Sequence, residues 1–185
     1  MRKHHLLGAI LLCGGLFSCS SEVIQQANYE IIPLPQEIKI STGNFVLNDR
    51  TSIVYPKGND EMQQNANLLA TYIRQMSGKK LKVIDEQITS NVITLTTGLN
   101  TDNAEAYQLK VTPDNIIIRG ASEAGTFYGI QTLRKSLPAT NKGDISLPGV
   151  EINDYPRFSY RGVHLDVSRH FFPIDSIKRF IDMMA

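Results

Sequence analysis

The chain has 185 residues, of which 42% are hydrophobic and 20% charged, and its 19 basic and 18 acidic residues give a formal net charge of +1. This length and composition are typical of an ordinary globular protein with one domain, or with one domain and part of another. A nearly balanced charge provides no electrostatic basis for binding nucleic acid, so we expect no nucleic-acid partner.

The first 18 residues have the organisation of an export signal. Two basic residues precede an apolar segment, Leu6–Phe17, which is shorter than the roughly 20 residues needed to span a bilayer. The segment ends in LFSC, which resembles the lipobox of bacterial lipoproteins, in which the cysteine is lipidated. We therefore expect residues 1–18 to be a signal peptide, Cys19 a lipid anchor to a membrane, and residues 19–27 a polar tether. The protein would then be an exported lipoprotein in the periplasm or at the cell surface; the alternative is a buried N-terminal helix with an incidental cysteine.

Residues 28–153 are predicted to form an α+β domain with a sheet of about five to seven strands. Two of the β-prone segments form a hairpin, and the run of three isoleucines in its second arm indicates a strand covered on both faces. Residues 146–153 are expected to be a connection. The β-prone segments are Tyr29–Ile32, Glu37–Ile40, Phe45–Leu47, Ser52–Tyr55, Leu81–Ile84, Val92–Thr96, Tyr107–Val111 and Ile116–Arg119.

Two helices accompany this sheet. The first begins at Asn59 or Asp60, has apolar residues four, three, four and three apart, and ends at the glycine of the sequence SGKK. The second covers residues 122–138 and contains Gly125 and Gly129 on one face, at a cost of about 1 kcal/mol each relative to alanine. A close approach of the helix backbone to the sheet would offset that cost. A phosphate site is disfavoured, because its glycines precede a helix.

Residues 154–185 have the order of elements of a first barrel unit: a loop, an apolar strand over Tyr160–Val167, a polar turn and a helix with one apolar face. The sequence stops inside this helix without a capping residue. A (β/α)8 barrel needs about 250 residues. We therefore expect a truncated chain in which the α+β domain is followed by the start of a truncated TIM barrel.

Candidate functional residues lie in this last stretch. The guanidinium of Arg161 suits a carboxylate or two adjacent sugar hydroxyls, and the alternative is a salt bridge to a local carboxylate such as Asp154. Asp166 lies at the end of the strand, where barrel enzymes place active groups; alternatively it pairs with Arg169 or caps the helix. In a regular strand Arg161 and Asp166 point to opposite faces, so both enter the barrel only if a bulge intervenes.

The two histidines of this stretch carry less weight. His164, on an apolar strand, is interpreted as a core histidine. His170 has no second histidine or carboxylate at metal-ligand spacing, so we expect no metal site and no cofactor.

Three parts of the sequence together resemble glycoside hydrolase family 20, the β-N-acetylhexosaminidases. The most specific is DYPRFSYRGVHLDVSRHFFP at residues 154–173, which is similar to the start of the catalytic domain of that family. EAGTFYGIQTL at 123–133 and IPLP at 32–35 are similar to the second helix and first strand of its N-terminal domain. The resemblance extends over residues 28–185.

The resemblance implies a role for several residues. Arg161, in the YRG motif, would bind hydroxyls of a terminal N-acetylhexosamine, while Asp166, Arg169 and His170 would support the neighbouring loop. Hydrolysis would be substrate-assisted and retaining, with the acetamido oxygen as nucleophile, a glutamate as acid and base and an aspartate orienting the acetamido group. No residue here matches that Asp–Glu pair, so we expect the fragment alone to be inactive.

The expected function is thus that of the N-terminal part of an exo-acting enzyme that removes terminal GlcNAc or GalNAc from glycans. Two alternatives remain open. One is a non-catalytic glycan-binding or scaffolding lipoprotein module, and the other is a different glycosidase with the same small domain ahead of its barrel.

Overall fold

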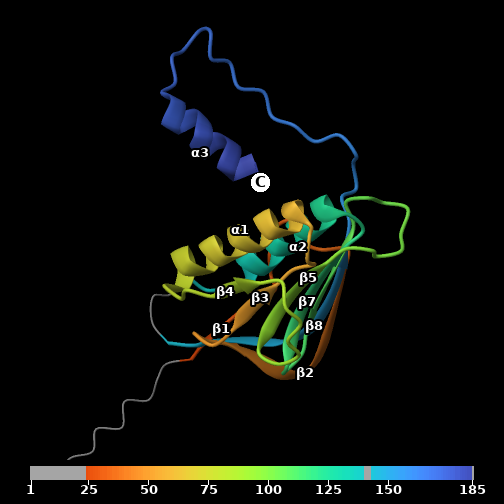
Figure 1. The fold of residues 1–185 in the computed structure, drawn as a ribbon. Coiled ribbons are helices and arrows are strands. Elements are labelled where there is room, and N and C mark those ends of the chain that lie inside the picture. Colours follow the sequence, from red (N-terminus) through yellow and green to blue (C-terminus); the bar gives the residue numbers. More distant parts are fainter. Residues whose placement is uncertain (1–23, 140–142, 185) are drawn as a thin grey trace, which may run out of the picture.

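The computed structural model of the chain describes residues 24–139 and 143–184 (Figure 1). The expected signal peptide and the expected anchor Cys19 lie outside these residues. Gln25–Gln26, at the end of the expected tether, form a short strand beside Ile145 and Ser146, so ordered sheet structure begins before residue 28. Among the described residues, no helix is long and apolar enough to cross a membrane.

Eight strands form one mixed sheet, and two helices, α1 and α2, lie side by side on one of its faces (Figure 1). The strand order is β1-β8-β6-β7-β5-β3-β4, with β2 along the other side of β8. Strands β3, β4, β5 and β7 are parallel neighbours, whereas β6, β8 and β2 pair in antiparallel fashion. The elements are β1 Gln25–Gln26, β2 Glu37–Leu47, β3 Ser52–Val54, α1 Asp60–Ser77, β4 Lys82–Ile84, β5 Val92–Thr96, β6 Tyr107–Val111, β7 Asn115–Gly120, α2 Glu123–Ser136, β8 Ile145–Asp154 and α3 Ile174–Met184.

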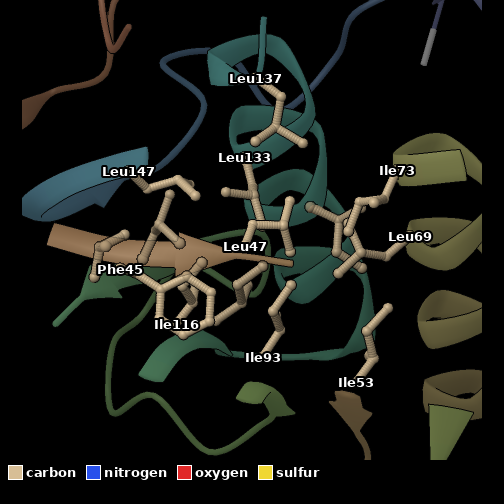
Figure 2. Close-up of a cluster of buried hydrophobic side chains, with 14 of the residues drawn as sticks. Phe45, Leu47, Ile53, Leu69, Ile73, Ile93, Ile116, Leu133, Leu137 and Leu147 are labelled. Atoms are coloured by element: carbon tan, nitrogen blue, oxygen red, sulfur yellow. The ribbon is translucent and has the colours of Figure 1, made fainter. Parts of the chain in front are cut away.

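Helix α1 has the boundaries and the buried face that its sequence predicts. Asn59 is the cap, since its side chain accepts a hydrogen bond of 3.0 Å from the backbone N–H of Met62. Gly78 ends the helix with a φ of 74°, a left-handed conformation that glycine adopts at little cost. The buried side chains of α1 meet those of the sheet and of α2 in the core (Figure 2). Fully buried members include Met62, Leu69, Ile73, Ile53, Ile93, Ile116 and Ile118.

Helix α2 lies unusually close to the sheet, as its two glycines predicted. A Cβ atom added at Gly125 would lie 2.3 Å from the carbonyl oxygen of Ala106, and one at Gly129 would lie 2.5 Å from Cγ2 of Ile118. Side chains at these positions would therefore push the helix off strands β6 and β7. The same close approach brings Tyr128, on the surface of α2, next to the loop before β6. There the hydroxyl of Tyr128 donates a hydrogen bond to Glu105.

Three predictions about the sheet are wrong. Tyr29–Ile32 forms no strand. The prolines at 33 and 35 cannot donate ladder bonds, and Tyr29 is instead held by a 2.8 Å hydrogen bond from its hydroxyl to the Pro148 carbonyl. The expected connection at 146–153 is part of the ten-residue strand β8. Ile117 is half-buried, so the face of β7 that points away from the helices is not fully covered.

The two strands expected at Glu37–Ile40 and Phe45–Leu47 are one strand, β2, with a register shift between Ile40 and Asn44. Gly43 lies inside this irregularity with a φ of 87°, which is typical of a β-bulge. Because the strand resumes its pairing with β8 beyond the bulge, both predicted segments belong to the same ladder.

The strand expected at Tyr160–Val167 is absent, and residues 160–167 form an irregular segment (Figure 1). A strand needs the backbone groups of a neighbour, and β8, which directly precedes this segment, is already paired on both sides by β1 and β6 and by β2. Helix α3 forms as predicted because its hydrogen bonds are internal. None of its residues is buried, however, and Ile174 and Ile181 are 67% and 58% exposed.

Candidate functional site

A cavity of about 530 Å³ lies where the chain leaves the sheet after β8. One wall is formed by residues 31–36, a second by the start of β6 and the loop before it, and a third by the outward side of α2. The fourth wall is the segment 154–161, which ends at Arg161. The lining includes Glu105, Tyr107, Tyr128, Gln131, Thr132, Asp154, Phe158 and Arg161.

The guanidinium of Arg161 is held by two residues of the α+β domain at residues 28–153, which is called the small domain below. Its Nη1 and Nη2 atoms donate to the two carboxylate oxygens of Glu105 at 3.1 and 2.8 Å, and Nη2 also donates to the hydroxyl of Tyr128 at 3.0 Å. Nη1 donates further to the carbonyl oxygen of Phe158 at 2.6 Å. The local carboxylate that the sequence suggested, Asp154, is therefore not its partner. The acid is Glu105, 56 residues earlier in the chain.

This cluster is electrostatically matched but only partly shielded from solvent. The hydrogen bonds from Arg161, together with the hydroxyl of Tyr128, hold the pKa of Glu105 below its usual range, and the carboxylate of Glu105 raises the pKa of Arg161. The Arg161 and Glu105 side chains are 39% and 31% exposed. At such exposure an ion pair contributes about 0.2–1 kcal/mol, and the bidentate geometry favours the upper part of that range.

Asp154, by contrast, belongs to the internal wall of the cavity. One of its oxygens accepts a hydrogen bond of 2.9 Å from the hydroxyl of Tyr107, and the other accepts one of 3.1 Å from the backbone N–H of Gln36. The hydroxyl of Tyr107 also contacts Thr132 Oγ1 at 2.5 Å, and burial raises the pKa of Tyr107. Asp154 thus connects β6 to the loop before β2, and its hydrogen bonds stabilise the fold.

The remaining candidates form a separate local turn. Asp166 accepts hydrogen bonds from the backbone N–H groups of Ser168 and Arg169, which lower its pKa, and it forms an ion pair with the Arg169 side chain. His164 and His170 are exposed, so the interpretation of His164 as a core residue is wrong. Within residues 24–139 and 143–184, no hydrogen bond or ion pair joins this turn to Arg161, and no group of three or more potential ligands is arranged to hold a metal.

Glu105 and Tyr128 are the site residues that sequence reasoning missed. Tyr128 lies within the EAGTFYGIQTL segment, next to Gly129, so its position on the outward face of α2 follows from the glycine spacing. Glu105 carries no such signal. It lies in a polar loop between β5 and β6, and only the folded sheet brings that loop to Arg161.

Comparison with known proteins defines the family. Residues 28–155 match the family model for glycosyl hydrolase family 20, domain 2, and residues 158–185 match the model for the catalytic domain of the same family. The chain belongs to glycoside hydrolase family 20. The Arg161–Glu105 pair thus joins a residue in the catalytic-domain match to one in the domain 2 match.

Several relatives support this membership. The chain is 36% identical to a beta-hexosaminidase from Porphyromonas gingivalis over 99% of this chain and 25% of that protein. It is 31% identical to a beta-N-acetylhexosaminidase from Cellulomonas fimi over 84% of this chain and 32% of that protein. The structure of the Streptomyces coelicolor enzyme superposes with a TM-score of 0.76 at 30% identity, covering 83% of this chain and 32% of that one. This chain spans a quarter to a third of the length of these relatives.

Proposed function

We propose that the chain is the N-terminal part of an exo-acting β-N-acetylhexosaminidase that removes terminal GlcNAc or GalNAc from glycans. The observation that carries the proposal is the catalytic-domain match at residues 158–185, which includes the YRG motif with Arg161. Relatives that are 31–36% identical carry the name of this activity, and a mutant of the Streptomyces plicatus enzyme was solved in complex with its product GlcNAc.

In this proposal residues 154–185 are the first βα unit of a barrel. The segment 160–167 would become a strand when a neighbouring barrel strand supplies backbone partners, and α3 would bury its apolar face against the barrel. The chemistry would be substrate-assisted: the 2-acetamido oxygen attacks the anomeric carbon as a glutamic acid protonates the leaving oxygen, and the resulting glutamate then activates water. That glutamate and the orienting aspartate would belong to the remainder of the barrel, because this chain matches only 25–32% of the length of its relatives.

Arg161 is the residue of this chain that we assign to the substrate. Two adjacent N–H donors of a guanidinium match two neighbouring hydroxyls of a sugar ring. The turn formed by Asp166 and Arg169 would support the loop after the strand, together with His170.

The experiment is hydrolysis of a p-nitrophenyl N-acetylglucosaminide by the native full-length protein. Each hydrogen bond from a charged group is worth about 1.5–3 kcal/mol, so loss of two in Arg161→Ala should lower kcat/KM by at least about 100-fold. Arg119→Ala is a matched control, because Arg119 lies exposed on β7 outside the cavity. Unchanged activity in Arg161→Ala would refute the assignment of Arg161. A protein that binds the sugar without hydrolysing it would favour the non-catalytic alternative.

For the export signal we propose lipidation of Cys19 and anchoring of the protein in a membrane outside the cytoplasm. This rests on the sequence LFSC after a basic and apolar leader. Labelling of expressing cells with a radioactive fatty acid should mark the wild-type protein and leave Cys19→Ser unlabelled. Equal labelling of both would contradict the proposal.

A further inference from the structure

The chain enters the sheet beside one end of strand β8 and leaves it from the other end. Strand β1 pairs with Ile145 and Ser146, whereas the catalytic-domain match begins at residue 158, shortly after Asp154. Strand β8 has ten residues, and a strand rises about 3.3 Å per residue, so these points are about 30 Å apart. We call the end of the sheet beside β1 the entry end and the end at Asp154 the exit end (Figure 1).

The entry of the chain is fixed beside the C-terminal end of helix α1. The backbone N–H of Gln25 donates to the carbonyl oxygen of Asp144 at 3.2 Å, and the carboxylate of Asp144 pairs with Nζ of Lys79 at 2.9 Å. The Lys79 side chain is only 8% exposed, so this ion pair is poorly accessible to solvent. The first described residues of the chain therefore have a defined place at the entry end.

The expected tether is too short to let the domain move far from a lipid anchor. Only five residues, 20–24, separate Cys19 from Gln25. A chain spans at most about 3.6 Å per residue, so Gln25 lies within about 22 Å of the cysteine. A lipid on Cys19 would thus keep the entry end near the membrane. Because this reach is shorter than β8, the exit end touches the membrane only if the domain lies flat on it.

Helices α1 and α2 both run from the exit end to the entry end. Helix α2 follows β7 at the exit end and finishes at the entry end, where the carbonyl of Ser136 accepts a 2.9 Å hydrogen bond from the backbone N–H of Asn28. Helix α1 has the same direction, because Asn59 at its start donates to Glu123 at the start of α2 at 3.0 Å. Its C-terminal end is followed by Lys79 at the entry end.

Charge is distributed unevenly along this direction. The first turns of both helices, at the exit end, carry acidic residues, and the last turns carry basic ones. Arg74 lies in the last turn of α1, and Lys80 and Lys82, which follow this helix, are exposed. Each Lys or Arg close to an anionic bilayer favours the contact by about five-fold. An anionic membrane surface therefore favours contact with the entry end over contact with the exit end.

We propose that the small domain is an upright spacer. Its entry end contacts an anionic membrane surface through Arg74, Lys80 and Lys82, and its exit end holds the start of the barrel about 30 Å farther from the membrane. This inference rests on the proposed lipidation of Cys19. The small domain then determines the height above the membrane at which the barrel begins.

The test uses the native full-length protein, lipidated and inserted into vesicles of equal parts phosphatidylcholine and phosphatidylglycerol. A fluorescent amino acid replaces Val46, which is exposed beside Ser146 at the entry end, or Thr101, which is exposed in the loop before β6 at the exit end. Energy transfer to an acceptor on the lipid headgroups measures the height of each position. Position 101 should lie about 20–30 Å higher than position 46. Equal heights, or a greater height for position 46, would overturn the proposal.

Charge variants test what keeps the domain upright. Lys80→Glu combined with Lys82→Glu should shift the two heights toward each other, because repulsion replaces attraction at the entry end. Lys57→Glu combined with Arg119→Glu makes the same charge change at exposed residues of the exit end, and should leave the height difference at least as large. In the wild type, about 1 M salt reduces the screening length to about 3 Å and should also reduce the difference.

Circular dichroism shows whether each variant folds, and the measurement in salt requires no substitution. A height difference that responds neither to salt nor to the change at Lys80 and Lys82 would refute the contact between these residues and the membrane. A difference that decreases in both experiments supports it.

The outcomes separate this inference from the proposed function. If the fatty acid labels Cys19 but positions 46 and 101 have equal heights, the anchor is present and the upright spacer is refuted. If Cys19 carries no lipid and the protein does not insert into vesicles, the lipidation and this inference both fail. An upright protein without hydrolase activity would overturn the proposed activity alone and support the spacer.

Discussion

Replacing Gly125 by alanine should destabilise the small domain, although alanine is the better helix former. The added Cβ would lie 2.3 Å from the carbonyl oxygen of Ala106, about 0.7 Å inside the 3.0 Å approach that Cβ atoms do not pass. That oxygen is fixed, since it accepts a 2.8 Å hydrogen bond from the backbone N–H of Ala121. Helix α2 must therefore move away from β6.

The magnitude is a balance of two terms. Overpacking of a close-packed interior costs about 1–3 kcal/mol, and contact with backbone places Gly125→Ala at the upper end. The gain in helix propensity returns about 1 kcal/mol. A net loss of about 2 kcal/mol in the free energy of unfolding corresponds to a decrease in Tm of roughly 6–10 °C for a domain of this size.

Thermal unfolding followed by circular dichroism measures this change. Ala124→Gly is the matched control in the same helix, because Ala124 is exposed and the substitution reports helix propensity alone, with a loss of up to about 1 kcal/mol. If Gly125→Ala were as stable as the wild type or more stable, the close approach of α2 to β6 would not explain the glycine.

Two further predictions concern capping and pH. Asn59→Ala should lower the free energy of unfolding by about 0.5–2 kcal/mol, because it removes the cap of α1, and urea titration measures this. The lowered pKa of Glu105 means that its pair with Arg161 stabilises the protein at pH values above the ordinary carboxyl pKa, about 4.3, and that this contribution is lost as the pH falls through the lowered value. The Tm difference between wild type and Glu105→Gln should therefore shrink between pH 6 and pH 3, and a difference that grows on acidification would contradict the assignment.

The elements that the sequence predicted well are those whose determinants are local. Helix α1 carries its cap, its apolar face and its terminal glycine within the 20 residues from Asn59 to Gly78. The hairpin of β6 and β7 likewise depends on a turn and on alternation within a few residues. The two glycines of α2 predicted a close approach to the sheet because only a packing constraint explains their cost in a helix.

The features that escaped prediction depend on contacts between distant residues. Strand β8 is hidden in the sequence because Pro148 and Gly149 interrupt its apolar alternation, and the register shift that absorbs them is made by β2, a hundred residues earlier. The same holds for the candidate site. The YRG motif indicates Arg161 as a candidate, whereas nothing in the sequence near Glu105 indicates that it is the partner. The two residues meet only because the fold brings the loop before β6 to the segment after β8.

The segment after β8 shows why one half of a predicted βα unit forms and the other does not. Both halves have the expected pattern, an apolar run at 160–167 and apolar residues three and four apart in α3. A helix satisfies its backbone hydrogen bonds from its own residues, so α3 forms even though Ile174, Ile181 and Met184 are all more than half exposed. A strand needs backbone hydrogen bonds to a neighbouring strand. The strand that directly precedes this segment, β8, has no free edge, because it is paired on both sides. The apolar pattern of 160–167 therefore specifies which residues a partner strand would cover, and only that partner decides whether the segment becomes a strand.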